Sequence, residues 1–165
     1  MTILNDRLQR KDLLREGAHV GGEWVPAGGQ GFPVTNPATG ETIAVLPRMT
    51  ASDTEAAVAA ADRALPAWRS LTALERSNVM RRWADLIRAN ADDIALILTA
   101  EQGKPVPEAK GEVVYSSQFL DWFAEEGRRL YGDVIPSHSS DVRIVVIKQP
   151  VGVTAGSRRG TCRPR

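Results

Sequence analysis

The sequence has little cysteine and histidine, which limits the chemistry that its side chains can perform. Cys162 is the only cysteine, so the chain has no internal disulfide. Arg159 and Arg163 flank it and would lower a thiol pKa, but no histidine is near in the sequence, and a passive residue is the simpler interpretation. His19 and His138 fit no metal-ligand spacing. The sequence therefore predicts no metal site and no catalytic residue.

Long apolar runs and a strong net charge are also missing. No run approaches the ~18 apolar residues of a membrane helix, and the first residues lack the apolar core of a signal peptide. The net charge of +1 conceals an asymmetry, because residues 157–165 carry four arginines and no acid while the rest is mildly acidic. This balance argues against nucleic-acid binding. We expect a cytoplasmic protein.

Short strands are predicted ahead of a helical body. Residues 1–16 are expected to form a short polar helix or arm. Strands are predicted at 19–25, 32–35 and 41–46, with turns at 27–31 and 36–40. The glycines at 28, 29 and 31 match neither the dinucleotide nor the P-loop spacing, and no helix follows them. We interpret them as a hairpin turn.

Two capping boxes are predicted to open the first two helices. Ser52 with Glu55, and Thr72 with Glu75, have the Ser/Thr-x-x-Glu spacing. Pro66 is expected to end or bend the first helix, since proline lacks the N–H that an interior position donates.

Two more helices are predicted on either side of a glycine–proline break. Asn90 is expected to cap a helix over 92–102, and Gly103 to close it in the left-handed conformation. A long helix is predicted over 108–131. Its aromatic side chains recur at three- and four-residue steps and form a face that must be covered, namely Tyr115, Phe119, Trp122 and Phe123. The β-branched segment 141–148 is predicted to be a strand paired outside the helical body.

Five segments have a distinctive amino-acid sequence. They are Glu-Gln-Gly-Lys-Pro at 101–105, Glu-Ala-Lys-Gly-Glu at 108–112, Trp-Phe-Ala-Glu-Glu-Gly at 122–127, Tyr-Gly-Asp-Val-Ile-Pro at 131–136 and Ile-Lys-Gln-Pro-Val-Gly-Val-Thr-Ala at 147–155. In this order they resemble the NAD(P)-dependent aldehyde dehydrogenases, with succinate-semialdehyde dehydrogenase as the nearest branch. The resemblance extends over roughly residues 16–156.

The resemblance implies an α/β fold with a Rossmann-like cofactor domain, a catalytic domain and an oligomerisation arm. This chain would supply the short N-terminal strands, the helices that pack on the cofactor domain, and the first strand of the arm. We expect an N-terminal arm at 1–16, the N-terminal portion of the dehydrogenase domain at 17–156, and a tail outside the family pattern at 157–165. Family members are homo-oligomers, so pairing with another subunit through 141–149 is expected. Helices without their partners should expose much apolar surface.

The implied activity is oxidation of succinate semialdehyde to succinate with NADP or NAD. The family uses a cysteine nucleophile, a glutamate base and glycines at the cofactor, and no position here matches them. We therefore expect the chain by itself to be inactive and to bind no cofactor. The resemblance places Tyr115 and Phe119 at the aldehyde entrance, unless both serve only as core. The chain could instead be a non-catalytic fragment that binds intact dehydrogenase subunits, or a pseudogene product.

The sequence leaves the family pattern abruptly at Gly156. Family members continue with Ile-Thr-Pro-Trp-Asn, whereas this chain continues with Ser-Arg-Arg-Gly-Thr-Cys. If one adenine is inserted after the Gly156 codon, permitted codons for the tail read Gly-Ile-Thr-Pro-Trp-Asn-Leu-Pro-Ala-Ala. The hypothesis is a one-nucleotide deletion, which is either real in the gene or an error of sequencing. The competing interpretation is an authentic, divergent C-terminus.

Sequencing the source DNA across the codons for residues 150–165 and the bases beyond them tests this hypothesis. We expect that one added base restores Ile-Thr-Pro-Trp-Asn in an open frame. Codons for the tail that yield no family motif in any frame would establish the divergent C-terminus instead.

Overall fold

Two antiparallel hairpins precede the main helices in the computed structural model, which describes residues 3–27 and 31–157. Strand β1 (Gly17–Val20) pairs with β2 (Glu23–Pro26), and β3 (Gly31–Thr35) pairs with β4 (Thr42–Pro47). The prediction of one strand over 19–25 is wrong, because Gly21 and Gly22 take φ of 61° and 94° and reverse the chain between β1 and β2. The predicted strands at 32–35 and 41–46 and the turn at 36–40 are confirmed.

The N-terminal segment is part of the core. It forms α1 (Ile3–Arg7) and a 3-10 turn, η1 (Lys11–Leu13). Leu4 and Leu8 are buried and cluster with Ile43 of β4 and Ala100. The prediction of a polar helix or arm over 1–16 is therefore wrong in its polarity, because these two leucines point one apolar face of the segment into the protein.

Four helices follow the hairpins: α2 (Ala51–Ser70), α3 (Ala73–Ala89), α4 (Ala91–Gln102) and α5 (Val106–Glu126). The capping box of Thr72 and Glu75 is confirmed on α3. On α2 the box is Thr50 with Asp53, not Ser52 with Glu55, so the helix begins earlier than predicted.

Pro66 lies within α2, which continues to Ser70. Of the two expected effects, ending the helix is wrong, and bending it stays a prediction. The carbonyl that loses its partner there belongs to the exposed Asp62, where water can replace the lost hydrogen bond. Asn90 precedes α4 as predicted, but its side chain makes no cap, because its Nδ2 donates back to the Leu86 carbonyl at 2.7 Å.

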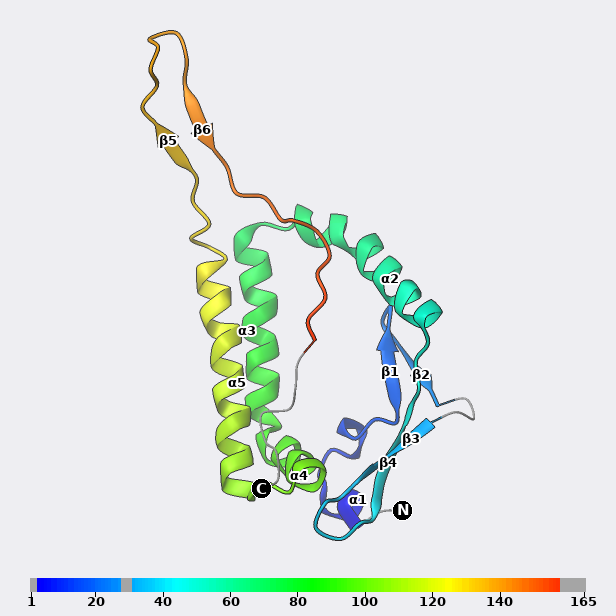
Figure 1. Ribbon diagram of the computed structural model, residues 1–165. Helices are drawn as coiled ribbons and strands as arrows, with labels where there is room; N and C mark the ends of the chain where they lie inside the picture. The colour runs from blue at the N-terminus through cyan, green and yellow to red at the C-terminus, as the bar shows by residue number, and fades with distance from the viewer. Residues whose placement is uncertain (1–2, 28–30, 158–165) are drawn as a thin grey trace.

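Gly103 ends α4 at φ 73°, which confirms the predicted left-handed cap. The long helix is shorter than its predicted range of 108–131: it begins at Val106 and ends at Glu126, so Leu130 and Tyr131 lie beyond it. Figure 1 shows α3 and α5 side by side, with α4 crossing at one end of the pair.

A third hairpin projects from the helical body (Figure 1). Strand β5 (Asp133–Ile135) pairs antiparallel with β6 (Ile144–Val146), with Val134 opposite Val145. The predicted strand over 141–148 is thus shorter than expected, and its pairing away from the helices is confirmed. Within the described residues no helix is long and apolar enough to span a bilayer.

The N-terminal segment is tied to α4 by one buried carboxylate. Asp93, in the first turn of α4, is 5% exposed and accepts hydrogen bonds from the backbone N–H groups of Gln9 at 3.1 Å and Arg10 at 2.8 Å. Its charge also lies at the favourable end of the α4 dipole. This contact holds Leu8 against the core.

We predict that Asp93→Ala lowers the free energy of unfolding by about 1–3 kcal/mol, because two backbone donors lose their acceptor. Urea unfolding followed by circular dichroism measures the change. Asp92→Ala is the matched control: Asp92 occupies the same helical turn, but it is exposed and pairs with Lys110 at 2.5 Å. The control should cost less than about 1 kcal/mol. Equal losses in the two variants would contradict the role given to Asp93.

Candidate functional site

An aromatic face on α5 is the most distinctive surface of the helical body. Its four aromatic side chains are exposed by 60%, 48%, 62% and 56%, in the order Tyr115, Phe119, Trp122 and Phe123. Together with Gln118 they line a shallow hollow of about 310 Å³. The predicted need for a covering surface is met by no described part of the chain. We call these four residues the aromatic face.

Tyr115 and Phe119 contact each other within this face. They stand one helical turn apart, and their rings meet edge to face, with centroids 5.0 Å apart and planes at 79°. The structure thus brings together the two residues that the family resemblance implies at an aldehyde entrance. Their wall is apolar, and the phenol of Tyr115 adds one hydroxyl that can donate a hydrogen bond to a carbonyl.

The other side of α5 is buried against α3 and α4 through small side chains. Ala109, Val113, Ser117 and Ala124 are at most 5% exposed. Small side chains let helices approach closely, so this side must face inward and the aromatic face outward. The sequence signal for this buried side is the set of small residues on the side of α5 opposite the aromatic side chains.

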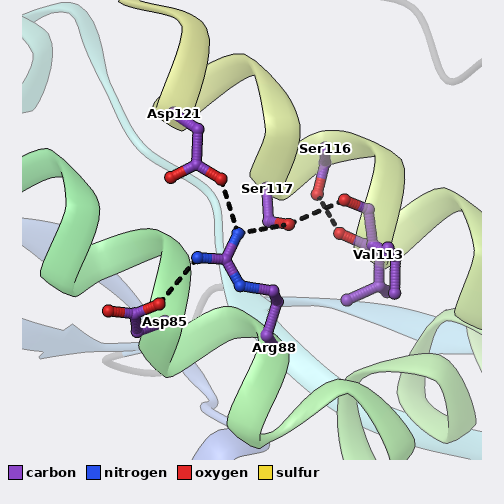
Figure 2. A network of polar contacts seen from close by, with 7 residues as sticks. Asp85, Arg88, Val113, Ser116, Ser117 and Asp121 are labelled. Atoms are coloured by element: carbon purple, nitrogen blue, oxygen red, sulfur yellow. Dashed lines mark hydrogen bonds and ion pairs between the residues drawn. The ribbon is translucent and has the colours of Figure 1, made fainter. Parts of the chain in front are cut away.

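A polar network holds α3 and α5 in register (Figure 2). Arg88 on α3 reaches across to α5, where its Nη1 donates to Asp121 Oδ2 at 2.7 Å and to Ser117 Oγ at 3.3 Å. Its Nη2 donates to Asp85 on its own helix at 2.6 Å. The hydrogen bonds to Asp121 and Asp85 raise the pKa of Arg88 above its ordinary value. A permanently charged group therefore fixes the rotation of α5.

Ser117 completes this network from inside. Its side chain is fully buried, and its Oγ donates to the Val114 carbonyl at 2.7 Å while it accepts from Arg88. Further along the pair, Arg81 of α3 forms an ion pair with Glu125 of α5. Sequence reasoning missed both links between α3 and α5, because the partners are 33 and 44 positions apart and carry no local signal.

The segment at 101–105 forms the corner between α4 and α5. Lys104 pairs with Glu112, which lies in the second turn of α5. Gly103 lies so near Pro37 that an added Cβ would stand 3.0 Å from its Cγ, so the corner abuts the turn after β3. Burial raises the pKa of Glu101, which lines a cavity of about 490 Å³ with Arg15 and Trp24. These contacts show that the segment at 101–105 serves as a structural corner.

The remaining sequence candidates carry no assembled site. The rings of His19 and Trp24 contact each other, with their centroids 5.1 Å apart. His138 is exposed in the loop between β5 and β6. Among residues 3–27 and 31–157, no three His, Cys, Asp or Glu side chains gather as metal ligands. Cys162 and the glycines at 28 and 29 lie outside the described residues.

Three comparisons bear on this arrangement. Residues 24–156 match the profile of the aldehyde dehydrogenase family. The chain is 58% identical over 151 residues to the glutarate-semialdehyde dehydrogenase of Pseudomonas aeruginosa, covering 90% of this chain and 31% of the relative. It is 52% identical over 150 residues to the NADP(+) succinate-semialdehyde dehydrogenase of Escherichia coli, with 90% and 31% covered.

The fold comparison agrees with the sequence comparison. The crystal structure of succinate-semialdehyde dehydrogenase from Burkholderia pseudomallei superimposes with a TM-score of 0.85 at 50% identity, covering 88% of this chain and 30% of that one. The chain thus spans about a third of the length of these relatives, and the matched part is N-terminal. The match of helices and short strands is therefore to the N-terminal portion of the aldehyde dehydrogenase fold.

Proposed function

Because this chain belongs to the aldehyde dehydrogenase family, we propose that it forms the N-terminal part of an enzyme that oxidises succinate or glutarate semialdehyde to the dicarboxylate with NADP or NAD. The observation that carries the proposal is the identity of 58% and 52% to two relatives, each named for a semialdehyde of a dicarboxylic acid. We propose a cytoplasmic location for this enzyme.

In the whole enzyme, the helices would pack on a Rossmann-like cofactor domain and the β5–β6 hairpin would begin the oligomerisation arm. The exposed apolar surface supports the first part, because the aromatic face needs a partner. For the second, β5 and β6 form a two-stranded sheet, so each has an edge without a strand partner in the described chain. Val145 is 62% exposed and Ile147 67%. Segment 141–149 is therefore suited to pairing with another subunit in a homo-oligomer.

The described residues do not fit NADP or NAD by themselves. A dinucleotide site needs a glycine-rich turn from a strand into a helix N-terminus. In the described chain, the strand-to-helix connection from β4 to α2 is Arg48-Met49-Thr50, without glycine. No step through the cofactor is assigned to these residues.

The role proposed for the described residues is to bind and orient. Tyr115 and Phe119 would form one wall of the passage by which the aldehyde enters, where apolar rings exclude water from the carbonyl. Arg88, through Asp121 and Ser117, would hold that wall at a fixed angle. Residues 1–165 alone should carry no dehydrogenase activity, because no family nucleophile or base is matched.

A second candidate function is that of a non-catalytic chain that binds intact dehydrogenase subunits. The aromatic face and the edge of β6 favour it, since both are apolar and exposed. Co-purification of residues 1–165 with an intact relative would support this function. A stable, solitary monomer at high concentration would count against it.

We predict that residues 1–155, joined to the remainder of the Pseudomonas aeruginosa relative, form an active enzyme. The chimera should reduce NADP or NAD with succinate or glutarate semialdehyde, as measured by absorbance of the reduced nicotinamide. Residues 1–165 alone should give no reduction above the protein-free blank. A folded but inactive chimera would overturn the dehydrogenase proposal, and activity of residues 1–165 would refute their inactivity.

In the same chimera, Tyr115→Ala and Phe119→Ala should each raise the KM for the aldehyde several-fold with a smaller change in kcat. The reason is that each removes apolar wall without touching the reacting atoms. Tyr131→Ala is the matched control, since Tyr131 is 69% exposed and lies outside the aromatic face. An unchanged KM, or an equal rise in the control, would remove Tyr115 and Phe119 from the entrance.

A further inference from the structure

The chain after β6 passes the junction of α2 and α3 (Figure 1). A basic hollow lies between these segments. It has a volume of about 720 Å³, within the usual range for small-molecule sites. Four cationic residues line it: Arg69 at the end of α2, Arg76 on α3, Arg128 after α5 and Lys148 after β6. We call these four residues, with Trp68 and Leu130 beside them, the basic hollow.

No carboxylate of the described chain lines this hollow. The acids nearest in sequence are engaged elsewhere: Glu75 accepts from the Thr72 N–H at 2.7 Å, and Glu126 pairs with Arg129 at 2.7 Å. Glu125 pairs with Arg81. Four cationic residues therefore share one concavity without a carboxylate counter-charge from residues 3–27 or 31–157.

Helix ends offset only a small part of this charge. The C-termini of α2 and α5 each contribute about half a negative charge, and the N-terminus of α3 contributes about half a positive charge. Arg76 also donates to the Leu71 carbonyl through Nη1, which leaves its Nη2 for another acceptor. The remaining excess of positive charge favours an anion over a neutral ligand.

The shape and chemistry of the hollow restrict further which kind of anion fits it. Guanidinium groups match phosphate oxygens with paired N–H donors, and three of the four cations here are arginines. Trp68, which is 40% exposed, and Leu130, which is 61% exposed, add an apolar wall. We propose that the basic hollow binds a phosphate monoester that carries an aromatic ring, with the phosphate on the cations and the ring on Trp68. This site is independent of the proposed dehydrogenase function.

Calorimetric titration of residues 1–165 with phenyl phosphate and with inorganic phosphate tests the proposal. Both should bind saturably, phenyl phosphate more tightly, and added salt should weaken both. The Arg128→Gln, Lys148→Gln double variant should weaken both ligands at least about tenfold, since each loses charge-assisted hydrogen bonds. Arg82→Gln is the control, because it removes the same kind of charge from α3 outside the hollow. It should leave both affinities unchanged.

Trp68→Leu separates the two parts of the site. It should reduce the affinity for phenyl phosphate to that for inorganic phosphate while leaving inorganic phosphate unaffected. Absence of saturable binding, or binding that the double variant leaves unchanged, overturns the site. An unchanged preference for phenyl phosphate in Trp68→Leu overturns the aromatic ligand. If the double variant loses its circular dichroism spectrum, Lys148→Gln alone decides, since Lys148 lies outside every helix and strand.

Discussion

The close packing of α5 on α3 and α4 is the interaction on which the rest of the structure depends. Its buried side chains are small, among them Ala84 on α3, Ala95 on α4, and Ala109 and Ala124 on α5. Such a seam gains little from hydrophobic burial per residue, but it permits only one rotation of α5. Arg88 then locks that rotation by joining Asp85 on one helix to Asp121 on the other (Figure 2). The outward direction of the aromatic face follows from this seam.

The consequence is an unusual distribution of apolar surface. Seven of the eleven buried hydrophobic residues among those described are alanines, whereas the aromatic face and Trp83 and Leu86 of α3 are about half exposed or more. Covering the four rings of the aromatic face would remove about 400 Å² of apolar surface from water, worth about 10 kcal/mol. That is comparable with the entire net stability of an ordinary domain, about 5–15 kcal/mol. Contact with a further surface would therefore add a stability comparable with that of an ordinary domain.

Features with a local signal could be predicted from the sequence, and those that depend on distant partners could not. Thr72 with Glu75, the left-handed Gly103 and the aromatic face each rest on spacings of a few residues, and all are found. The first capping box was displaced by two positions, because Asp53 serves as well as Glu55 in that role. The burial of Leu8 and the Asp93 link to Gln9 could not be predicted, since 84 positions separate that donor and acceptor. For the candidate site, the shared face of Tyr115 and Phe119 follows from helical spacing, whereas the Arg88 network requires the packed structure.

The pattern of pKa shifts distinguishes a scaffold from a reaction centre. An acid–base site needs titratable groups whose environments drive their pKa values apart within one cavity. Here hydrogen bonds within the capping boxes lower the pKa of Asp53 and of Glu75, and a hydrogen bond from Arg10 lowers that of Asp12 to about 2. All three carboxyls are exposed. A lowered pKa stabilises the folded chain at any pH above the ordinary carboxyl pKa, and this stabilisation is lost as the pH falls through the lowered value. Partial desolvation raises the pKa of Glu101 instead. Among the described residues, the other titratable groups that line its cavity are Asp12 and Arg15. The charged groups of these contacts thus serve to hold helices and corners in place.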